Sequence, residues 1–206
     1  TYLLVSKYTA PMHATKAATG TRLKIMELAQ DLLRERGYNG FSYGHIAEAL
    51  GVKNAAIHYH FPSKEDLGVA LLARERRRLQ KWIERKQIRE LDSWGRLNWF
   101  FSIYQHYSEG GTRVCFLGAL ESSFGDLPAS IQQESAALNR EMLDWLGAEL
   151  DAGRQAGAFH FAGEPASKAA LVIGALQGAI QMSRLGRPQQ LDTVIAQLKA
   201  DLQPLN

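Results

Sequence analysis

Residues 53–60, Lys-Asn-Ala-Ala-Ile-His-Tyr-His, combine side-chain types that suit contact with nucleic acid. In a helix, Ile57 is the only large aliphatic anchor, and burying it turns the amide, basic and aromatic side chains outward. Such groups reach base edges and phosphates, while alanine allows close approach to a thymine methyl group. We therefore predict a helix that enters the major groove of DNA. The predicted DNA contacts, on this helix and at the neighbouring helix starts, are Ser42, Tyr43, Lys53, Asn54, Ala56, His58, Tyr59, His60 and Lys64.

The surrounding stretch predicts the elements that hold this helix. Ser42 can cap a preceding helix, in which apolar residues at helical spacing form one face. Gly51 stands where a left-handed residue ends such a helix, and Asn54 is expected to cap the second helix, residues 54–60. Two short helices around a tight turn containing glycine form the helix-turn-helix pattern.

A third helix is expected to begin after Ser63 and to run to about Glu90. Ser63 and Asp66 form a variant capping box at its start. The free N–H groups of a helix N-terminus favour an anion, and Lys64 adds a full charge, so we predict that Lys64 contacts the DNA backbone. The basic run at residues 74–78 contains Glu75 and is expected to be a solvated face with intrahelical ion pairs.

The charge of the chain is divided unevenly along its length. Residues 1–92 carry 16 Lys and Arg against 10 Asp and Glu, a balance of +6, whereas residues 93–206 carry 8 against 11, a balance of −3. A basic N-terminal part fits an anionic partner bound at one end. The alternative is that the short helix pair packs inside an all-helical core, because generic helix-turn-helix patterns also arise by chance.

Composition bounds the class of protein. The chain has 206 residues, of which 46% are hydrophobic, and a single cysteine. It is long enough for a sizeable core, has no apolar run that could span a membrane, and can form no internal disulfide, which fits the cytoplasm. We predict an all-α fold with a flexible N-terminal arm (1–20), a three-helix DNA-binding domain with the helix-turn-helix (21–67), and a larger helical domain for ligand binding and dimerisation (68–206).

The N-terminal motifs resemble the DNA-binding region of the TetR (tetracycline-repressor-like) family of dimeric regulators. The resemblance implies a helical C-terminal domain that binds a small inducer. The sequence departs from the family pattern at Ala55-Ala56 and at His58, and these two departures leave the operator sequence undetermined. The matching residues are the helix Thr21 to Arg36 with Gly37-Tyr38, Phe41-Ser42, His45-Ile46-Ala47, Ala49-Leu50-Gly51-Val52, Ile57-His58-Tyr59-His60-Phe61 and Ser63-Lys64-Glu65-Asp66-Leu67.

Aromatic residues crowd the sequence beyond residue 92. Apolar walls with few polar groups are typical of ligand cavities between helices, although aromatic residues at helical spacing also fill cores. Helices are expected from about Arg113 to Phe124 and from about Pro128 to Ala156. The composition favours an apolar or aromatic inducer. The predicted ligand-binding residues are Trp99, Tyr104, Tyr107, Cys115, Phe116, Glu121, Phe124, Trp145 and Gln177.

Cys115 and Gly118 are similar to a Cys-x-x-Gly segment in a subgroup of these repressors, some of which sense electrophiles or oxidants. The neighbouring Arg113 could lower the pKa of the thiol and raise its reactivity. The alternative is a small buried hydrophobic residue, because free cysteine is among the most buried residue types.

Two helices are expected in the last part of the chain, at residues 165–184 and 188–202. The first carries a smooth stripe of small and amide side chains, and the second carries an amphipathic aliphatic stripe. Two such helices from each subunit can form the four-helix interface of a two-fold dimer, which would read a palindromic operator.

Other classes of protein fit the sequence less well. A Cys115–His106 nucleophile pair has no supporting motif, and no cofactor or metal site is predicted. His58 and His60 diverge by roughly 200° on a helix and cannot share a metal ion there. The sequence therefore predicts a ligand-responsive transcriptional regulator, more specifically a repressor released by its inducer. A helical ligand-binding or interaction protein, or a cysteine-dependent enzyme, remains the alternative.

Overall fold

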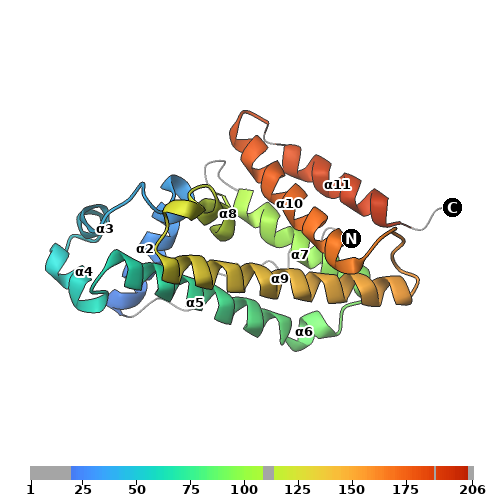
Figure 1. The fold of residues 1–206 in the computed structure, drawn as a ribbon, viewed down its shortest axis with the longest axis horizontal. Coiled ribbons are helices and arrows are strands. Elements are labelled where there is room, and N and C mark those ends of the chain that lie inside the picture. The colour runs from blue at the N-terminus through green and yellow to red at the C-terminus, as the bar shows by residue number, and fades with distance from the viewer. Residues whose placement is uncertain (1–19, 109–113, 188, 204–206) are drawn as a thin grey trace. The chain divides into compact units, whose positions relative to one another are not determined.

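The computed structural model describes residues 20–108, 114–187 and 189–203, and within these ranges the chain forms helices and no strands (Figure 1). The predicted all-α fold is confirmed. None of the described helices is both long and apolar enough to cross a membrane. The helices are α2 (Thr21–Arg36), α3 (Tyr43–Leu50), α4 (Asn54–His60), α5 (Lys64–Ile83), α6 (Lys86–Arg89), α7 (Ser93–Ser108), α8 (Phe116–Glu121), the 3-10 turn η1 (Phe124–Asp126), α9 (Ala129–Gln155), α10 (Pro165–Arg184) and α11 (Gln190–Leu202).

The chain divides into two compact units. Of the described residues, the helix-turn-helix unit contains 20–78 and 115–138, and the C-terminal unit contains 79–108, 114, 139–187 and 189–203. Helix α8 belongs to the helix-turn-helix unit because it packs against α2. The units therefore combine segments that are distant in sequence, unlike the contiguous domains that the sequence predicts.

The core of the helix-turn-helix unit takes at least one fully buried aliphatic side chain from each of α2, α3, α4 and α5. Ile25 of α2, Ile46 of α3, Ile57 of α4 and Leu67 of α5 are all inaccessible to solvent. Helix α2 contacts both α3 and α4, which also contact each other. This buried cluster sets the orientation of the two short helices, because each of them has only one apolar face to bury.

The core of the C-terminal unit is aromatic and aliphatic. Phe100, Phe101 and Tyr104 of α7 are fully buried, and α7 packs against both α10 and α11. The aliphatic stripe of α11 is also buried within the same chain, at Leu191, Ile195, Leu198 and Leu202. The prediction that this stripe serves the dimer interface is therefore wrong. Helix α11 has a single apolar face, and its neighbours α7 and α10 lie in contact with it.

The helix predicted to run from Ser63 to about Glu90 is broken. Helix α5 ends at Ile83, and α6 begins at Lys86 after the extended residue Arg85. Trp82 and Ile88 are both buried, yet an uninterrupted helix would hold them about 120° apart around its axis. The break allows both side chains to be buried.

The helix expected from about Arg113 to Phe124 is shorter than predicted. Arg113 lies outside the described residues, α8 spans Phe116–Glu121, and Phe124 begins the separate 3-10 turn η1. By contrast, α9 begins directly after Pro128 and ends at Gln155, close to the predicted bounds.

Candidate DNA-binding interface

The turn between α3 and α4 has the predicted geometry. Gly51 adopts the left-handed conformation with φ of 65°, and its N–H donates to the carbonyl of Glu48. The next N–H, from Val52, donates to the carbonyl of Ala47 at 3.0 Å, which closes the helix end. At the other end of α3, the Ser42 N–H donates to Nδ1 of His45 at 3.2 Å. Both ends of α3 are therefore set by local hydrogen bonds.

The sequence predicts that Asn54 caps α4, but Asn54 is the first helical residue of α4 and Lys53 is the cap. Lys53 takes the cap position in extended conformation, and its carbonyl accepts the N–H of Ala56 at 2.9 Å. The Lys53 side chain makes no capping bond, and the Asn54 side chain is exposed to solvent. Its amide is therefore available to a ligand outside the protein.

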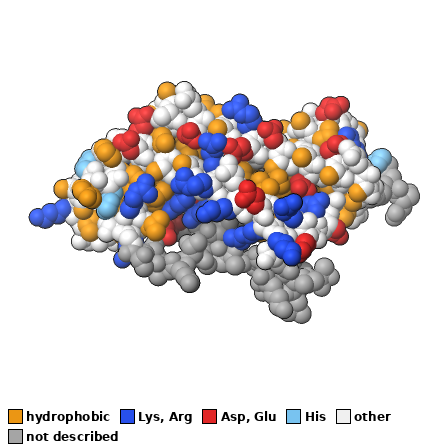
Figure 2. Space-filling model, turned by 90° about the horizontal axis from the view of Figure 1, so that it is seen from below, with side chains coloured by type: hydrophobic (Ala, Val, Ile, Leu, Met, Phe, Trp, Pro, Cys, Tyr) orange, Lys and Arg blue, Asp and Glu red, His pale blue; other side chains and the backbone are white. Residues whose placement is uncertain are grey.

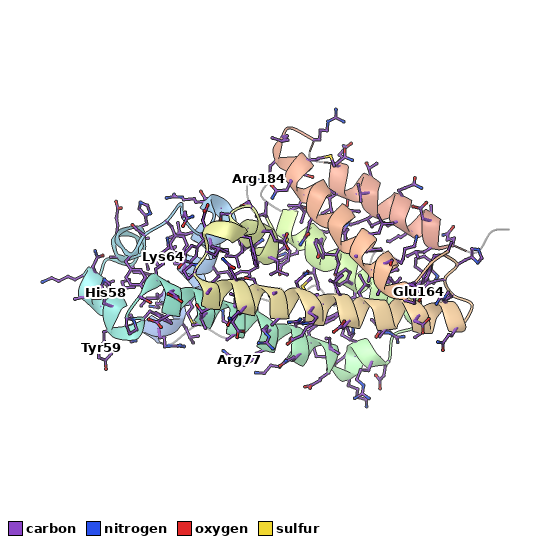
Figure 3. All side chains as sticks on the ribbon, in the orientation of Figure 1. His58, Tyr59, Lys64, Arg77, Glu164 and Arg184 are labelled. Carbon is purple, nitrogen blue, oxygen red and sulfur yellow. The ribbon has the colours of Figure 1, made fainter. Side chains whose placement is uncertain are left out.

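Helix α4 presents its polar and aromatic side chains to solvent. Tyr59 is 84% exposed, and Figure 3 shows it projecting away from the ribbon. A ring nitrogen of His58, Nδ1, lies 3.1 Å from the carbonyl oxygen of Pro62. Because a carbonyl only accepts, Nδ1 carries the hydrogen, and Nε2 is left to act as an acceptor when the ring is neutral. In the view of Figure 2, the surface around α3 and α4 carries His side chains beside basic and apolar side chains.

Tyr43, a predicted DNA contact, is buried within the helix-turn-helix unit. Its hydroxyl lies 2.9 Å from the carbonyl oxygen of Phe61 and 2.5 Å from that of Ser63, to which it donates. Burial, with the nearby Asp66 carboxylate, raises the pKa of Tyr43 to about 12. The side chain joins the start of α3 to the loop between α4 and α5, and its ring also supports His58 edge-on at 4.8 Å.

Lys64 is also turned inward (Figure 3). Its Nζ donates to the carbonyl of Phe41 at 2.6 Å and lies 4.5 Å from the ring centres of both Tyr38 and Phe41. Burial lowers the pKa of its ammonium group. The charge that the sequence assigned to a DNA phosphate is thus engaged inside the unit.

The predicted capping box at the start of α5 is confirmed. The Ser63 N–H donates to Oδ2 of Asp66 at 2.9 Å, and the Asp66 N–H donates to the Ser63 hydroxyl at 3.1 Å. Glu65 adds a second carboxylate to the first turn. Two carboxylates therefore occupy the surroundings of this helix N-terminus, where the sequence predicted a phosphate.

The basic run at residues 74–78 is only partly solvated, which corrects the sequence prediction. Arg77 is exposed, but Arg74 and Glu75 are buried. Arg74 donates to the Gln30 side-chain oxygen and, at 3.1 Å, to the carbonyl of Met26. Burial lowers the pKa of Arg74 to about 10. The signal was present in the sequence, since Arg74 follows Leu67 and Leu71 on one helical face.

The predicted ligand-binding residues are divided between the two units. Trp99 and Trp145 contact Trp82, which stacks on Trp99 at a centroid distance of 3.4 Å and meets Trp145 edge-on at 4.8 Å. Glu121 and Phe124 are exposed. In the C-terminal unit lie Trp99, Tyr104, Tyr107, Trp145 and Gln177, and in the helix-turn-helix unit lie Cys115, Phe116, Glu121 and Phe124.

Cys115 is buried at the start of α8, where its position has a local structural reason. Its Sγ accepts the N–H of Gly118 at 3.3 Å and so caps the helix. A Cβ atom on Gly118 would lie only 3.0 Å from that Sγ. The Cys-x-x-Gly spacing thus lets the sulfur approach the helix end closely. Reactivity of the thiol stays a prediction, and Arg113 lies outside the described residues.

A helix-turn-helix with an exposed second helix, followed by a helical C-terminal unit, defines a class of DNA-binding regulators. Two family models match the chain: "Bacterial regulatory proteins, tetR family" at residues 25–71 and "Tetracyclin repressor-like, C-terminal domain" at residues 94–198. The chain belongs to the TetR family of bacterial transcriptional regulators, and its role is regulatory, not enzymatic.

Individual relatives cover almost the whole chain. The HTH-type transcriptional repressor NemR of Escherichia coli (strain K12) is 23% identical over 191 residues, which are 87% of this chain and 92% of that protein. A TetR transcriptional regulator from Legionella pneumophila has 27% identity and a TM-score of 0.81, covering 91% of this chain and 100% of that one. A TetR-family regulator from Agrobacterium tumefaciens has 26% identity and a TM-score of 0.82, covering 89% and 97%. Both family domains are therefore represented along the chain.

Proposed function

We propose that this chain is a homodimeric repressor that binds a palindromic operator in the cytoplasm and is released by a small apolar or aromatic inducer. The observation that carries the proposal is the contrast within α4, where Ile57 is fully buried and Tyr59 is 84% exposed. A helix that exposes an aromatic ring, an amide and imidazoles gains little from solvation alone. It gains contacts when it is seated in a DNA groove.

The proposed DNA contacts fall into two roles. Side chains at the surface read bases or bind phosphates, whereas Tyr43 and Lys64 hold the ends of the short helices in place. A positioning role follows from their inward hydrogen bonds. The surface group consists of Ser42, Lys53, Asn54, Ala56, His58, Tyr59 and His60.

The proposed dimer uses α10. Leu171 and Met182 are 58% and 44% exposed, and no atom lies within 4 Å of a Cβ built on Gly174 or Gly178. No other described residue covers this face at Gly174 and Gly178, and the small residues permit close approach of a second helix. Residues 188–202 contribute with their polar side, since the aliphatic side of α11 is buried. A two-fold axis would place two α4 helices on two half-sites.

The proposed response to the inducer depends on two helices. Helices α5 and α9 each contain residues of both units, so they connect the ligand-binding part to the DNA-binding part within one element. An inducer that binds one dimer shape more tightly than another shifts the population toward that shape. A changed separation of the two α4 helices then weakens operator binding.

The deciding experiment is a selection of random duplex DNA with the purified protein at two salt concentrations. We expect enrichment of a palindrome, with affinity that falls steeply as salt rises, because phosphate contacts release counterions. Absence of enrichment at low salt would contradict the proposal. It would favour the alternative of a helical ligand-binding or interaction protein without specific DNA binding.

A further inference from the structure

Four exposed residues form one continuous face of α4. Asn54, Ala55, His58 and Tyr59 are all exposed to solvent, and Figure 3 shows His58 and Tyr59 on this helix. At about 100° per residue, the four positions fall within about 140° of the helix circumference, and the buried Ile57 lies on the other side. His58 and Ala55 are in the middle of the exposed face. The short alanine side chain leaves room for a base beside the imidazole.

The imidazole of His58 is held inside the protein on two sides. Its Nδ1 donates to the carbonyl oxygen of Pro62 at 3.1 Å. The Tyr43 ring meets the imidazole at a centroid distance of 4.8 Å and an interplanar angle of 66°. Tyr43 is itself fixed by the hydrogen bonds of its hydroxyl to the carbonyl oxygens of Phe61 and Ser63. The orientation of the imidazole is therefore set before DNA is bound.

The hydrogen bond to Pro62 determines what the free side of the ring can do. Because Nδ1 carries the hydrogen, Nε2 of the neutral imidazole has only a lone pair and acts as an acceptor. No described residue is hydrogen-bonded to Nε2. Phosphate and sugar oxygens of DNA accept as well, so the neutral ring gains no hydrogen bond from the DNA backbone. Guanine and thymine likewise present only acceptors in the major groove, whereas adenine N6 and cytosine N4 are amino groups that donate.

We propose that His58 selects adenine or cytosine, against guanine and thymine, at one position of the operator strand that it contacts in each half-site. Nε2 accepts a hydrogen bond from the amino group of either base. With guanine or thymine, two acceptors face each other, and both lose their hydrogen bonds to water. The proposal rests on the proposed function, since it names the base chemistry that one residue of α4 reads.

The first measurement compares the operators selected by the wild type and by His58→Asn at about pH 8, at which imidazole is neutral. In the wild type we expect one position of each half-site that admits adenine and cytosine and excludes guanine and thymine. In His58→Asn, that position should admit all four bases about equally. The asparagine amide can still donate to the carbonyl of Pro62, but it is too short to place an acceptor where Nε2 lies. The melting temperature should therefore not change.

His60→Asn is the matched control, because it makes the same chemical change about 200° away around the helix. Whatever its effect on overall affinity, it should leave the preference at the His58 position intact. Loss of that preference in both variants would contradict the assignment to His58.

The second measurement changes the DNA and uses the wild-type protein, so it does not depend on how the variant folds. Purine in place of the contacted adenine, or pyrimidin-2-one in place of the contacted cytosine, removes only the amino group. Each should weaken wild-type binding about fivefold, the loss expected for one neutral hydrogen bond, and should not weaken binding of His58→Asn. 7-Deazaadenine keeps the amino group and lacks the N7 acceptor, so it should affect both proteins equally.

The inference is overturned by guanine or thymine at the His58 position, by a preference that persists in His58→Asn, or by a 7-deazaadenine effect confined to the wild type. The last result would mean that His58 donates to the base. A selected palindrome without an adenine-or-cytosine position contradicts this inference alone, whereas the absence of any palindrome contradicts the operator proposal as well. The two failures are therefore distinguishable.

Discussion

At the scale of single residues, the helix-turn-helix unit contains exposed side chains on α4 that we propose meet DNA, and inward side chains on α3 and α5 that position the short helices. Tyr59 and Asn54 are exposed to solvent. Tyr43 and Lys64 are turned inward and hold backbone carbonyls at the ends of the short helices. Substitutions in the two groups should therefore affect different measurable quantities.

Tyr59→Phe should weaken binding to every DNA sequence by a few-fold, because it removes one neutral hydrogen bond to the backbone. Asn54→Ala should instead relax discrimination at one or two base pairs of each half-site, by about 1–3 kcal/mol. Affinity measured for the selected operator and for its point variants distinguishes the two effects. The melting temperature serves as the control and should not change, since both side chains are exposed. If both variants bind all sequences as the wild type does, α4 does not enter the groove.

Lys53→Met and Lys64→Met form a matched pair. Lys53 is exposed, so its loss should reduce the salt dependence of operator binding by about one phosphate contact without affecting stability. Lys64→Met should leave the salt slope unchanged and lower the free energy of unfolding by about 1–2 kcal/mol, because the carbonyl of Phe41 loses its donor. A reduced salt slope for Lys64→Met would show that this lysine binds phosphate after all.

Tyr43 should make stability sensitive to alkaline pH. Burial raises its pKa from 10.0 to about 12, so the folded state favours the neutral phenol. This contribution is fully present below about pH 10 and is lost as the pH rises through 12. In Tyr43→Phe, denaturant unfolding between pH 9 and pH 12, an interval set by that shift, should show a shallower fall in stability than in the wild type. The pKa of Tyr38 is raised to a similar value, so Tyr38 accounts for the pH dependence of stability that remains in Tyr43→Phe.

At the scale of elements, a buried polar contact joins α2 to α5. Arg74 donates to Gln30 and to the carbonyl of Met26, and Arg78 bonds Glu75 at 2.6 Å beside them. Two donors of Arg74, Nε and Nη1, find no partner among the described residues. The contact therefore carries a desolvation cost, and it fixes the relative position of two helices more than it stabilises the fold.

Arg74→Met should destabilise the protein by about 1–3 kcal/mol, because the carbonyl of Met26 loses its side-chain donor and the side-chain oxygen of Gln30 keeps only the 3.3 Å bond from Arg78. Adding Gln30→Met should restore most of that loss, since an apolar pair of similar size needs no hydrogen bonds. A double-mutant cycle of urea unfolding measures the coupling. Strictly additive losses would mean that the two side chains do not act as a pair.

At the scale of the whole molecule, the proposed two-fold dimer would account for the face of α10 that no described residue covers. Apolar side chains and open glycines on one surface helix are costly in a monomer and useful in an interface. Dimerisation also multiplies the affinity of one helix-turn-helix, because the second half-site is bound intramolecularly.

Gly174→Arg should convert the dimer to a monomer and reduce operator affinity by at least a hundredfold, because a charged side chain replaces an open position on the interface. Sedimentation velocity measures the first effect and gel shift the second. Ala152→Arg on the exposed side of α9 is the control and should remain dimeric. A Gly174→Arg dimer with normal affinity would place the interface elsewhere.

Local chemistry determined much of this protein from the sequence alone. The bounds of α2, α4 and α10, the left-handed Gly51 and the Ser63–Asp66 capping box were all predictable. Caps, helix-ending glycines and helical periodicity depend on residues within a few positions of each other, so they can be predicted from the sequence. The resemblance of residues 21–67 to a known family, and hence the regulatory class, follows from the same local patterns.

Only the tertiary structure decided which way the ambiguous side chains face. Tyr43 and Lys64 look like surface groups in the sequence, yet each hydrogen-bonds a carbonyl at least 18 residues away in the chain. The break after Ile83 and the burial of the α11 stripe likewise depend on neighbours that are remote in sequence. Burial is a property of what packs against a residue, and a linear pattern shows a helical face without showing what covers it.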